Sequence, residues 1–223
     1  MAVAVNRTQL ARMIEHSQLR AYATQVDISE LCDEALQYGF HAVAVNPAWA
    51  PFCAKKLAGS RVGVCVTVGF PLGANTAQVK LEEARDAARN GATELDMVIN
   101  IGALKSGYPG YVEREIAAVV KAVRGIPVKV ILETSYLTRD EKIAVCEMSI
   151  RAGAAFVKTS TGYGQGGATI EDVTLMKQVV GDQLGIKAAG GIRTYGDAVA
   201  VIQAGATRIG TSAGVEIFED APQ

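Results

Sequence analysis

Residues 151–158 read Arg151-Ala152-Gly153-Ala154-Ala155-Phe156-Val157-Lys158. The glycine ends a helical pattern, and the apolar run after it has the composition of a strand. The same passage from helix through glycine to strand occurs at Arg89-Asn90-Gly91-Ala92 and at Gln203-Ala204-Gly205-Ala206, which we interpret as degenerate internal repeats. Such repeats predict βα units around a parallel sheet.

Short apolar runs rich in β-branched residues alternate with longer amphipathic stretches along the chain. Strands covered by helices outside and filled with side chains inside should be apolar nearly throughout, as Val62-Gly63-Val64-Cys65-Val66 is. We expect eight strands, at about residues 14–17, 41–45, 62–68, 94–98, 128–132, 155–158, 185–188 and 207–210. Eight βα units close a barrel. We therefore predict an α/β chain that forms a single (β/α)8 TIM-barrel domain over residues 1–223, with a short helix at about 7–13 and the barrel at about 14–219.

Two helix starts carry the pattern of a capping box, Asp27-x-x-Glu30 and Thr138-x-x-Glu141. An apolar stripe at helical spacing follows each of them, at Ile28, Leu31, Ala35 and Tyr38 and at Ile143, Cys146 and Ile150. We expect both stripes to pack on the barrel.

The composition narrows the classes of partner. Net charge is −1, with both signs interspersed, whereas a nucleic-acid or membrane surface needs a clustered basic face. The start of the chain does not read as a signal peptide, and no segment approaches a membrane span, so we expect a cytoplasmic protein with a small-molecule partner. The four cysteines lack the spacing of a zinc or redox motif and are interpreted as buried apolar residues: Cys32, Cys53, Cys65 and Cys146.

Two lysines end neighbouring predicted strands. Lys158 precedes Thr159-Ser160-Thr161-Gly162, and Lys187 occupies the same depth on the next strand. Catalytic groups of such barrels lie at the carboxyl ends of the strands, although a solvated lysine at a strand end remains the alternative. Two close ammonium groups disfavour each other, and partial desolvation adds to this effect, so one amine should lose its proton near neutral pH. A neutral amine is the nucleophile of Schiff-base chemistry.

A carboxylate is embedded in the apolar strand Glu94-Leu95-Asp96-Met97-Val98. Buried carboxylates are rarely unpaired, so Asp96 forms either a structural ion pair with one of the lysines or a proton shuttle beside them. Glu133 is open to two interpretations as well, as a second acid or as the acceptor of a structural hydrogen bond to a neighbouring loop. His16 and His41 are interpreted as structural histidines.

Glycines follow the last two predicted strands, at Gly190-Gly191 and at Gly210-Thr211-Ser212. Barrels commonly build a phosphate site from these two loops, and glycines let backbone N–H groups approach an anion closely. The expected partner is therefore a phosphorylated small molecule.

The same residues resemble the motifs of the deoxyribose-phosphate aldolase family. The matching motifs are Val157-Lys158-Thr159-Ser160-Thr161-Gly162, Lys187-Ala188-Ala189-Gly190-Gly191-Ile192-Arg193 and Glu94-Leu95-Asp96-Met97-Val98. Their order and spacing agree as well, and the similarity runs from about Glu15 to Ser212. This coverage is far more specific than any single motif.

The resemblance implies a class I aldolase in which Lys158 condenses with the aldehyde of 2-deoxyribose 5-phosphate. It implies that Lys187 lowers the proton affinity of Lys158, that Asp96 works with Lys187 through water, and that neither a metal nor an organic cofactor takes part. It also implies a homo-oligomer, most simply a dimer. The phosphate-binding positions that carry over are Thr161, Gly162, Gly190, Gly191, Gly210 and Ser212.

The chain departs from the family at Glu15-His16-Ser17, where the usual sequence is Asp-His-Thr. Glu15 and Ser17 keep the chemistry of a substrate-binding pair but alter its reach, since Glu15 is one methylene longer. Two other functions stay open at this point. One is a different phosphate-binding barrel lyase or isomerase, and the other is a non-catalytic barrel that binds metabolites. The latter would keep the glycines but would have no use for two facing lysines.

Overall fold

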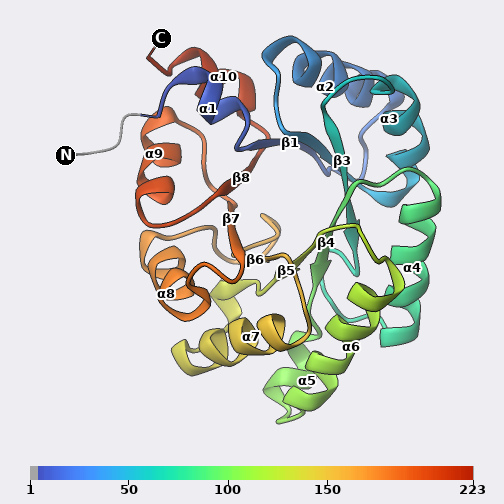
Figure 1. The fold of residues 1–223 in the computed structure, drawn as a ribbon, viewed down its shortest axis with the longest axis vertical. Helices are drawn as coiled ribbons and strands as arrows, with labels where there is room; N and C mark the ends of the chain where they lie inside the picture. The colour runs from blue at the N-terminus through green and yellow to red at the C-terminus, as the bar shows by residue number, and fades with distance from the viewer. Residues whose placement is uncertain (1–4, 223) are drawn as a thin grey trace.

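Eight parallel strands close into a barrel in the computed structural model, which describes residues 5–222 (Figure 1). Each strand pairs with its neighbours in the chain, and β8 returns to pair with β1. The predicted (β/α)8 barrel is confirmed. The strands are β1 (Ile14–Gln18), β2 (Ala42–Val45), β3 (Gly63–Val68), β4 (Glu94–Val98), β5 (Val128–Ile131), β6 (Phe156–Lys158), β7 (Gly185–Ala189) and β8 (Arg208–Thr211).

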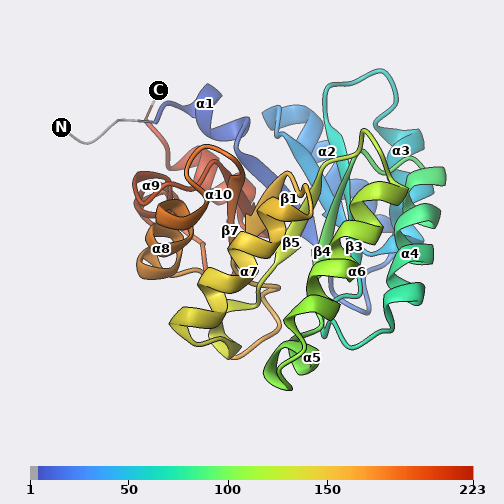
Figure 2. The same cartoon turned by 60° about the horizontal axis from the view of Figure 1, so that its bottom comes forward.

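Helices surround the barrel, as the two ribbon views show (Figures 1 and 2). Each α-helix from α2 to α9 lies in a connection between consecutive strands, and α1 and α10 flank β1 and β8. Their bounds are α1 (Arg7–Ala11), α2 (Gln25–Tyr38), α3 (Ala50–Lys56), α4 (Ala77–Arg89), α5 (Ile101–Lys105), α6 (Pro109–Ala122), α7 (Arg139–Arg151), α8 (Ile170–Val180), α9 (Tyr195–Gln203) and α10 (Gly214–Glu219), with short 3-10 turns η1 (Pro47–Trp49) and η2 (Thr134–Tyr136).

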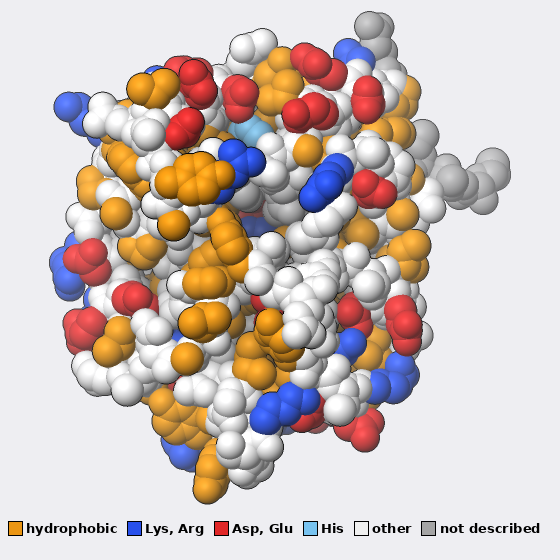
Figure 3. Space-filling view, turned by 180° about the vertical axis from the view of Figure 1, so that it is seen from behind, with side chains coloured by type: hydrophobic (Ala, Val, Ile, Leu, Met, Phe, Trp, Pro, Cys, Tyr) orange, Lys and Arg blue, Asp and Glu red, His pale blue; other side chains and the backbone are white. Residues whose placement is uncertain are grey.

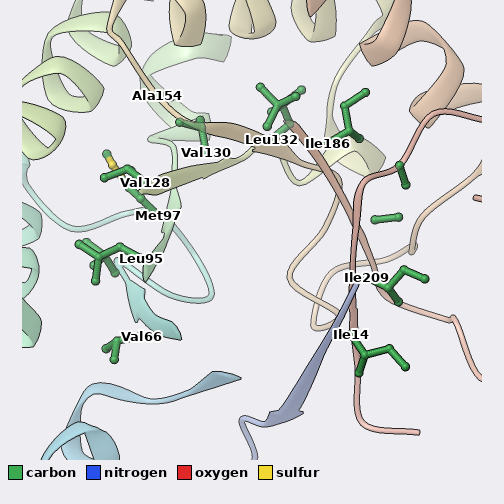
Figure 4. Close-up of a cluster of buried hydrophobic side chains, with 14 of the residues drawn as sticks. Ile14, Val66, Leu95, Met97, Val128, Val130, Leu132, Ala154, Ile186 and Ile209 are labelled. Carbon is green, nitrogen blue, oxygen red and sulfur yellow. The ribbon is translucent and has the colours of Figure 1, made fainter. Parts of the chain in front are cut away.

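The hydrophobic core lies between the strands and the helices. Side chains alternate across a strand, so every second residue faces outward. Apart from His16 and Thr211, these outward residues are apolar and fully or almost fully buried, and Figure 4 shows a cluster of them. Those labelled on the strands include Ile14, Val66, Leu95, Met97, Val128, Val130, Ile186 and Ile209.

The inner face of the barrel differs from the apolar interior that the sequence led us to expect. Glu15, Asp96 and Lys129 alternate with the outward apolar residues and are no more than 1% exposed. Only the strand residues that face the helices have to be apolar. The inner face tolerates charged residues because opposite charges meet there. The prediction of strands apolar on both faces was wrong for this reason.

Helix starts follow from capping. The box at Thr138 and Glu141 is confirmed, since each side chain accepts from the backbone N–H of the other residue. The predicted box at Asp27 was wrong: α2 begins one turn earlier, with Thr24 as N-cap and Asp27 as its N3 partner. Threonine and aspartate both suit an N-cap. Thr24 has the extended backbone of an N-cap, whereas Asp27 already lies within α2.

Several smaller predictions are confirmed. The predicted apolar stripe of α2 packs on the core, and all four cysteines are buried and free. Both ends of the described chain meet on one side of the barrel (Figure 1), where the Arg7 guanidinium donates to the carbonyls of Glu219 and Ala221 at 2.7 Å each. Within residues 5–222, no helix combines the length and the apolarity that crossing a membrane requires.

Candidate active site

Lys158, Lys187 and Asp96 meet inside the barrel. The Asp96 carboxylate accepts hydrogen bonds at one oxygen, Oδ2, from Lys158 Nζ at 2.7 Å and from Lys187 Nζ at 2.6 Å. Because both amines bind the same oxygen, the two nitrogens are separated by no more than the sum of these two distances. From the sequence we expected the two lysines to lie side by side. The structure shows them side by side, with the Asp96 carboxylate between their amines.

The strand register explains this meeting. Lys158 on β6 lies directly beside Lys187 on β7, so both side chains project inward at one level. Gly210 on β8 leaves the space that Lys187 occupies, since a Cβ at this position would lie 2.8 Å from Lys187 Cε. Residues with side chains at position 210 would therefore push Lys187 away from Asp96.

A third lysine, which the sequence analysis missed, lies deeper in the barrel. Lys129 Nζ is 2.6 Å from Glu94, 3.1 Å from Asp96 and 3.3 Å from Glu15. Its register partner on β4 is Asp96. The signal was present in Val128-Lys129-Val130, where a lysine alternates with two valines in a buried strand and therefore has to face the barrel interior.

Arg208 completes the network at the start of β8. Its Nη1 lies 3.1 Å from Glu15 and 3.2 Å from Glu94, and its guanidinium lies over the Phe156 ring, 5.2 Å from the centroid. Glu94 also binds His41 Nε2 at 2.6 Å. His16 binds Glu34 at 2.7 Å, so both histidines are hydrogen-bonded to carboxylates, as structural histidines are.

The charges of this network do not balance when every group is ionised. Within the described part of the chain, three carboxylates (Glu15, Glu94 and Asp96) face four bases (Lys129, Lys158, Lys187 and Arg208). An uncompensated buried charge is expensive, so one base is favoured to be neutral. Lys158 has one carboxylate partner, whereas Lys187 and Lys129 each have two or more, so Lys158 is the base that is easiest to deprotonate.

The pKa directions agree with this charge count. Burial lowers the pKa of Lys158; the Asp96 carboxylate opposes this effect, and the Lys187 ammonium adds to it. Burial also disfavours the Lys187 ammonium, but Asp96 and Glu15 outweigh it and raise the pKa of Lys187. Repulsion between the lysines, which the sequence analysis ranked first, is therefore weaker than desolvation at Lys158. Both directions make Lys158, and not Lys187, the amine that gives up its proton more readily.

The pKa of Asp96 lies well below its usual range, because the three neighbouring lysines outweigh the effect of its burial. The carboxylate is thus ionised at neutral pH and accepts a hydrogen bond from the Lys158 amine. Glu15 and Cys65 lie close to Asp96, and their ligand atoms are within 4.8 Å of one another, as in a metal site. Lys129 and Lys187 already bind these carboxylates, and such cations compete directly with a metal ion for the same oxygens.

Glu15 takes a different place from the one that the sequence suggested. It is fully buried beneath the lysines and binds Lys187, Lys129 and Arg208, and it does not line the cavity. In this structure Glu15 is therefore part of the charge network, and its role in substrate binding stays a prediction. Ser17, by contrast, does line the cavity.

A cavity of about 220 Å³ opens above Lys158 at the carboxyl ends of the strands. On the face shown in Figure 3, a hollow lies near the centre with Lys or Arg side chains beside it. Arg20 and Arg193 line the cavity, and the sequence analysis named neither as a site residue. The predicted binding positions that line it are Ser17, Thr161, Gly162, Gly190, Gly191, Gly210 and Ser212.

Backbone donors are available in this cavity. Within residues 5–222, the N–H groups of Gly162 and Gly191 have no protein acceptor, and both residues have a positive φ, 86° and 81°. Glycine adopts this backbone conformation without strain, and its lack of a side chain lets an anion come close to the N–H group. Two free amides with two arginines nearby suit an anionic group such as a phosphate.

The chain was compared with known proteins. The model of the DeoC/LacD family aldolases matches residues 1–220. A deoxyribose-phosphate aldolase of Thermococcus gammatolerans is 57% identical over 216 residues, which cover 95% of this chain and 96% of the relative. That of Thermococcus kodakarensis is 55% identical over 222 residues, covering 98% and 99%. A solved structure described as a tetrameric deoxyribose phosphate aldolase from Aeropyrum pernix superposes with a TM-score of 0.89 at 37% identity, covering 94% of this chain and 89% of the other.

Proposed function

The chain belongs to the DeoC/LacD aldolase family, and from this premise we propose that it cleaves 2-deoxy-D-ribose 5-phosphate reversibly to D-glyceraldehyde 3-phosphate and acetaldehyde. The observation that carries the proposal is the state of Lys158, an amine with a lowered pKa and a single carboxylate partner at the base of the cavity. Such an amine is neutral more readily than an ordinary lysine and can attack an aldehyde.

In the proposed mechanism, Lys158 Nζ adds to C1 of the open-chain sugar, and loss of water gives an iminium ion. A base then removes the proton of the C3 hydroxyl, and the C2–C3 bond breaks. Its electron pair moves toward the iminium and forms an enamine, while C3 becomes the aldehyde of glyceraldehyde 3-phosphate. Protonation of the enamine at C2 and hydrolysis release acetaldehyde and restore the amine.

Asp96 is suited to move protons in these steps. Its ionised carboxylate lies 2.7 Å from the reacting amine, and a water held beside it could carry protons to and from the substrate. Lys187 is fully buried and remains a cation, so its proposed part is electrostatic: it disfavours a second positive charge on Lys158 and holds Asp96 ionised. The phosphate would bind at Gly162, Gly190, Gly191, Gly210 and Ser212.

Trapping the imine tests the nucleophile. The protein is incubated with acetaldehyde, reduced with borohydride and digested, and the peptides are mapped by mass. We expect the two-carbon label on Lys158, and we expect Lys158→Leu to lose both the label and all detectable cleavage while its circular dichroism spectrum stays that of a folded protein. A label on any other lysine would refute the assignment.

An assay of acetaldehyde release from deoxyribose 5-phosphate separates the remaining alternatives. A different phosphate-binding lyase or isomerase would form the borohydride adduct or bind phosphate without releasing acetaldehyde, and a non-catalytic barrel would not turn over at all. Three broader predictions belong to the same proposal: the chain acts as one domain, in the cytoplasm, and as a homo-oligomer. The oligomeric state can be measured by sedimentation.

A further inference from the structure

Glu133 has an unusual backbone for its residue type. It directly follows Leu132 after β5, and its φ of 45° makes it the one non-glycine residue with a positive φ in the described ranges. Left-handed backbone is unfavourable for a residue with a Cβ, and it persists where surrounding contacts require it. The Glu133 side chain supplies such contacts, because the residue is only 1% exposed.

Its carboxylate takes both hydrogen-bond donors of Thr161. Oε2 of Glu133 accepts from the Thr161 N–H at 3.2 Å and from the Thr161 hydroxyl. The hydroxyl oxygen in turn accepts from the Tyr163 N–H at 3.0 Å. Thr161 lines the cavity, as the sequence analysis expected of a phosphate-binding residue, but both of its donors point at Glu133 and none is left for a ligand.

The loop after Lys158 is shaped to fit this carboxylate. A Cβ on Gly164 would lie 2.7 Å from Glu133 Cδ, and one on Gly166 would lie 3.1 Å from Ser135 Cβ. Side chains at these positions would separate the loop from the end of β5. Glycines at 164 and 166 therefore let the backbone lie directly on Glu133 and η2.

No cation accompanies the carboxylate: in the described part of the chain, Glu133 has no ion pair, and its Oε1 is buried with no hydrogen-bond partner. The hydrogen bonds to Thr161 are therefore the main interactions that compensate for the burial of the Glu133 side chain. These two hydrogen bonds tie the loop after Lys158 to the end of β5.

We propose that Glu133 is a positioning residue for phosphate recognition. It draws the two donors of Thr161 away from the cavity, and the next residue, Gly162, is thereby held at the cavity wall with its N–H free for an anion. The proposal rests on the proposed function, which supplies the phosphorylated substrate. Glu133 acts through Thr161 and Gly162 and does not touch the reacting atoms.

Replacing the carboxylate tests the proposal. Glu133→Gly removes the side chain and suits the left-handed backbone, so the variant should fold. We expect its KM for deoxyribose 5-phosphate to rise about 10-fold, because a displaced amide no longer meets the phosphate, with kcat within about twofold of the original. Cleavage of unphosphorylated 2-deoxyribose should be unchanged. Glu133→Gln, which keeps an acceptor oxygen, should restore most of the lost affinity.

A second variant perturbs the same contact from the loop. Gly164→Ala should raise the KM for the phosphorylated sugar because its methyl group displaces the Glu133 carboxylate. Gly102→Ala is the matched control, since a Cβ there meets only Asn100 Oδ1 at 3.5 Å, and it should leave KM unchanged. The proposal is overturned if Glu133→Gly and Gly164→Ala weaken both sugars equally or leave both unaffected.

Binding of inorganic phosphate, measured by titration calorimetry, keeps the two hypotheses apart. If the original protein releases no acetaldehyde, the proposed function fails, yet phosphate binding that is weaker in Glu133→Gly than in Glu133→Gln would still support the positioning role. If the original protein cleaves the sugar and both Glu133 variants bind phosphate as it does, the positioning role alone fails.

Discussion

Leu95 and Asp96 are neighbours on β4, yet they lie in two different regions of the molecule. Leu95 faces the helices in a shell of apolar side chains (Figure 4), whereas Asp96 faces the barrel axis among three lysines. Both are fully buried or nearly so. Burial alone therefore does not separate a residue that stabilises the fold from one that performs chemistry; the partners on each face do.

The two regions stabilise the fold by different means. Apolar burial in the outer shell stabilises the fold by roughly 25 cal/mol per Å². Each ion of the inner network loses several kcal/mol of hydration, and at Asp96, Lys129 and Lys187 the opposite charges outweigh the effect of burial. The apolar shell stabilises the fold around a charged interior whose residues serve the chemistry. Substitutions at the adjacent positions 95 and 96 should therefore affect stability and activity differently.

After Lys158→Leu, Asp96→Asn should produce the largest loss of activity. The variant removes the acceptor beside Lys158 and the counterion of three lysines, so we expect kcat/KM for deoxyribose 5-phosphate to fall about 100-fold to 10,000-fold. Steady-state cleavage assays measure this loss. Activity within tenfold of the original would remove Asp96 from the mechanism.

The same variant should lose stability in a pH-dependent manner. Without the carboxylate, the pKa of Lys158, which burial already lowers in the folded state, falls further below its value in the unfolded chain, 10.5, because Asp96 is the charge that opposes this lowering. A base with a depressed folded-state pKa destabilises the fold while it is charged in the unfolded state, and the penalty shrinks as pH rises toward 10.5. Urea unfolding at pH 6 and pH 9 should therefore show a smaller deficit at pH 9.

Leu95→Ala should show the opposite pattern. Removing a fully buried leucine leaves a cavity in the outer shell, which lowers the free energy of unfolding by about 2–5 kcal/mol, equally at both pH values. Its kcat at 25 °C should stay close to that of the original chain, because no group of the charge network is touched. A large loss of kcat in the folded variant would show that the two faces of β4 are coupled.

Lys187→Leu should have the smallest effect, which is a shift in the pH dependence of imine formation. Lys187 lowers the pKa of Lys158, and its removal also strengthens the pull of Asp96 on the Lys158 ammonium, so both changes raise that pKa. Imine formation requires the neutral amine, so its pH profile should move to higher pH. Lys105→Leu, at an exposed pair with Glu141, is the control and should not shift it. An unchanged profile in Lys187→Leu would remove the electrostatic part of the mechanism.

Much of the architecture could be predicted from sequence because it depends on local patterns. The predicted strands agree with the observed ones to within one residue at each end, since apolar runs bounded by glycine mark them well. Lys158, Lys187 and Asp96 could be chosen because each is a charged residue within or at the end of a strand that is otherwise apolar. The capping of α2 was misplaced because Thr24 and Asp27 are both good caps, and only chain geometry distinguishes them.

The deeper charges could not be assigned in the same way. Glu15 and Arg208 are 193 residues apart and meet because β8 pairs with β1 to close the barrel. Lys129 meets Asp96 through the register of β5 on β4. For Glu133 the sequence left two interpretations open, and the structure shows the hydrogen bond to a neighbouring loop, because the loop after Lys158 lies against the end of β5.

The sequence by itself determined the period of the strands, the glycines that end the helices and the lysines that end two neighbouring strands, because these features depend on residues close together in the chain. Only the tertiary structure decided which charges share the barrel axis, and hence which lysine has the fewest carboxylate partners. A pKa depends on every charge within a few Å, and closure of the barrel is what brings charges from both ends of the chain within that distance.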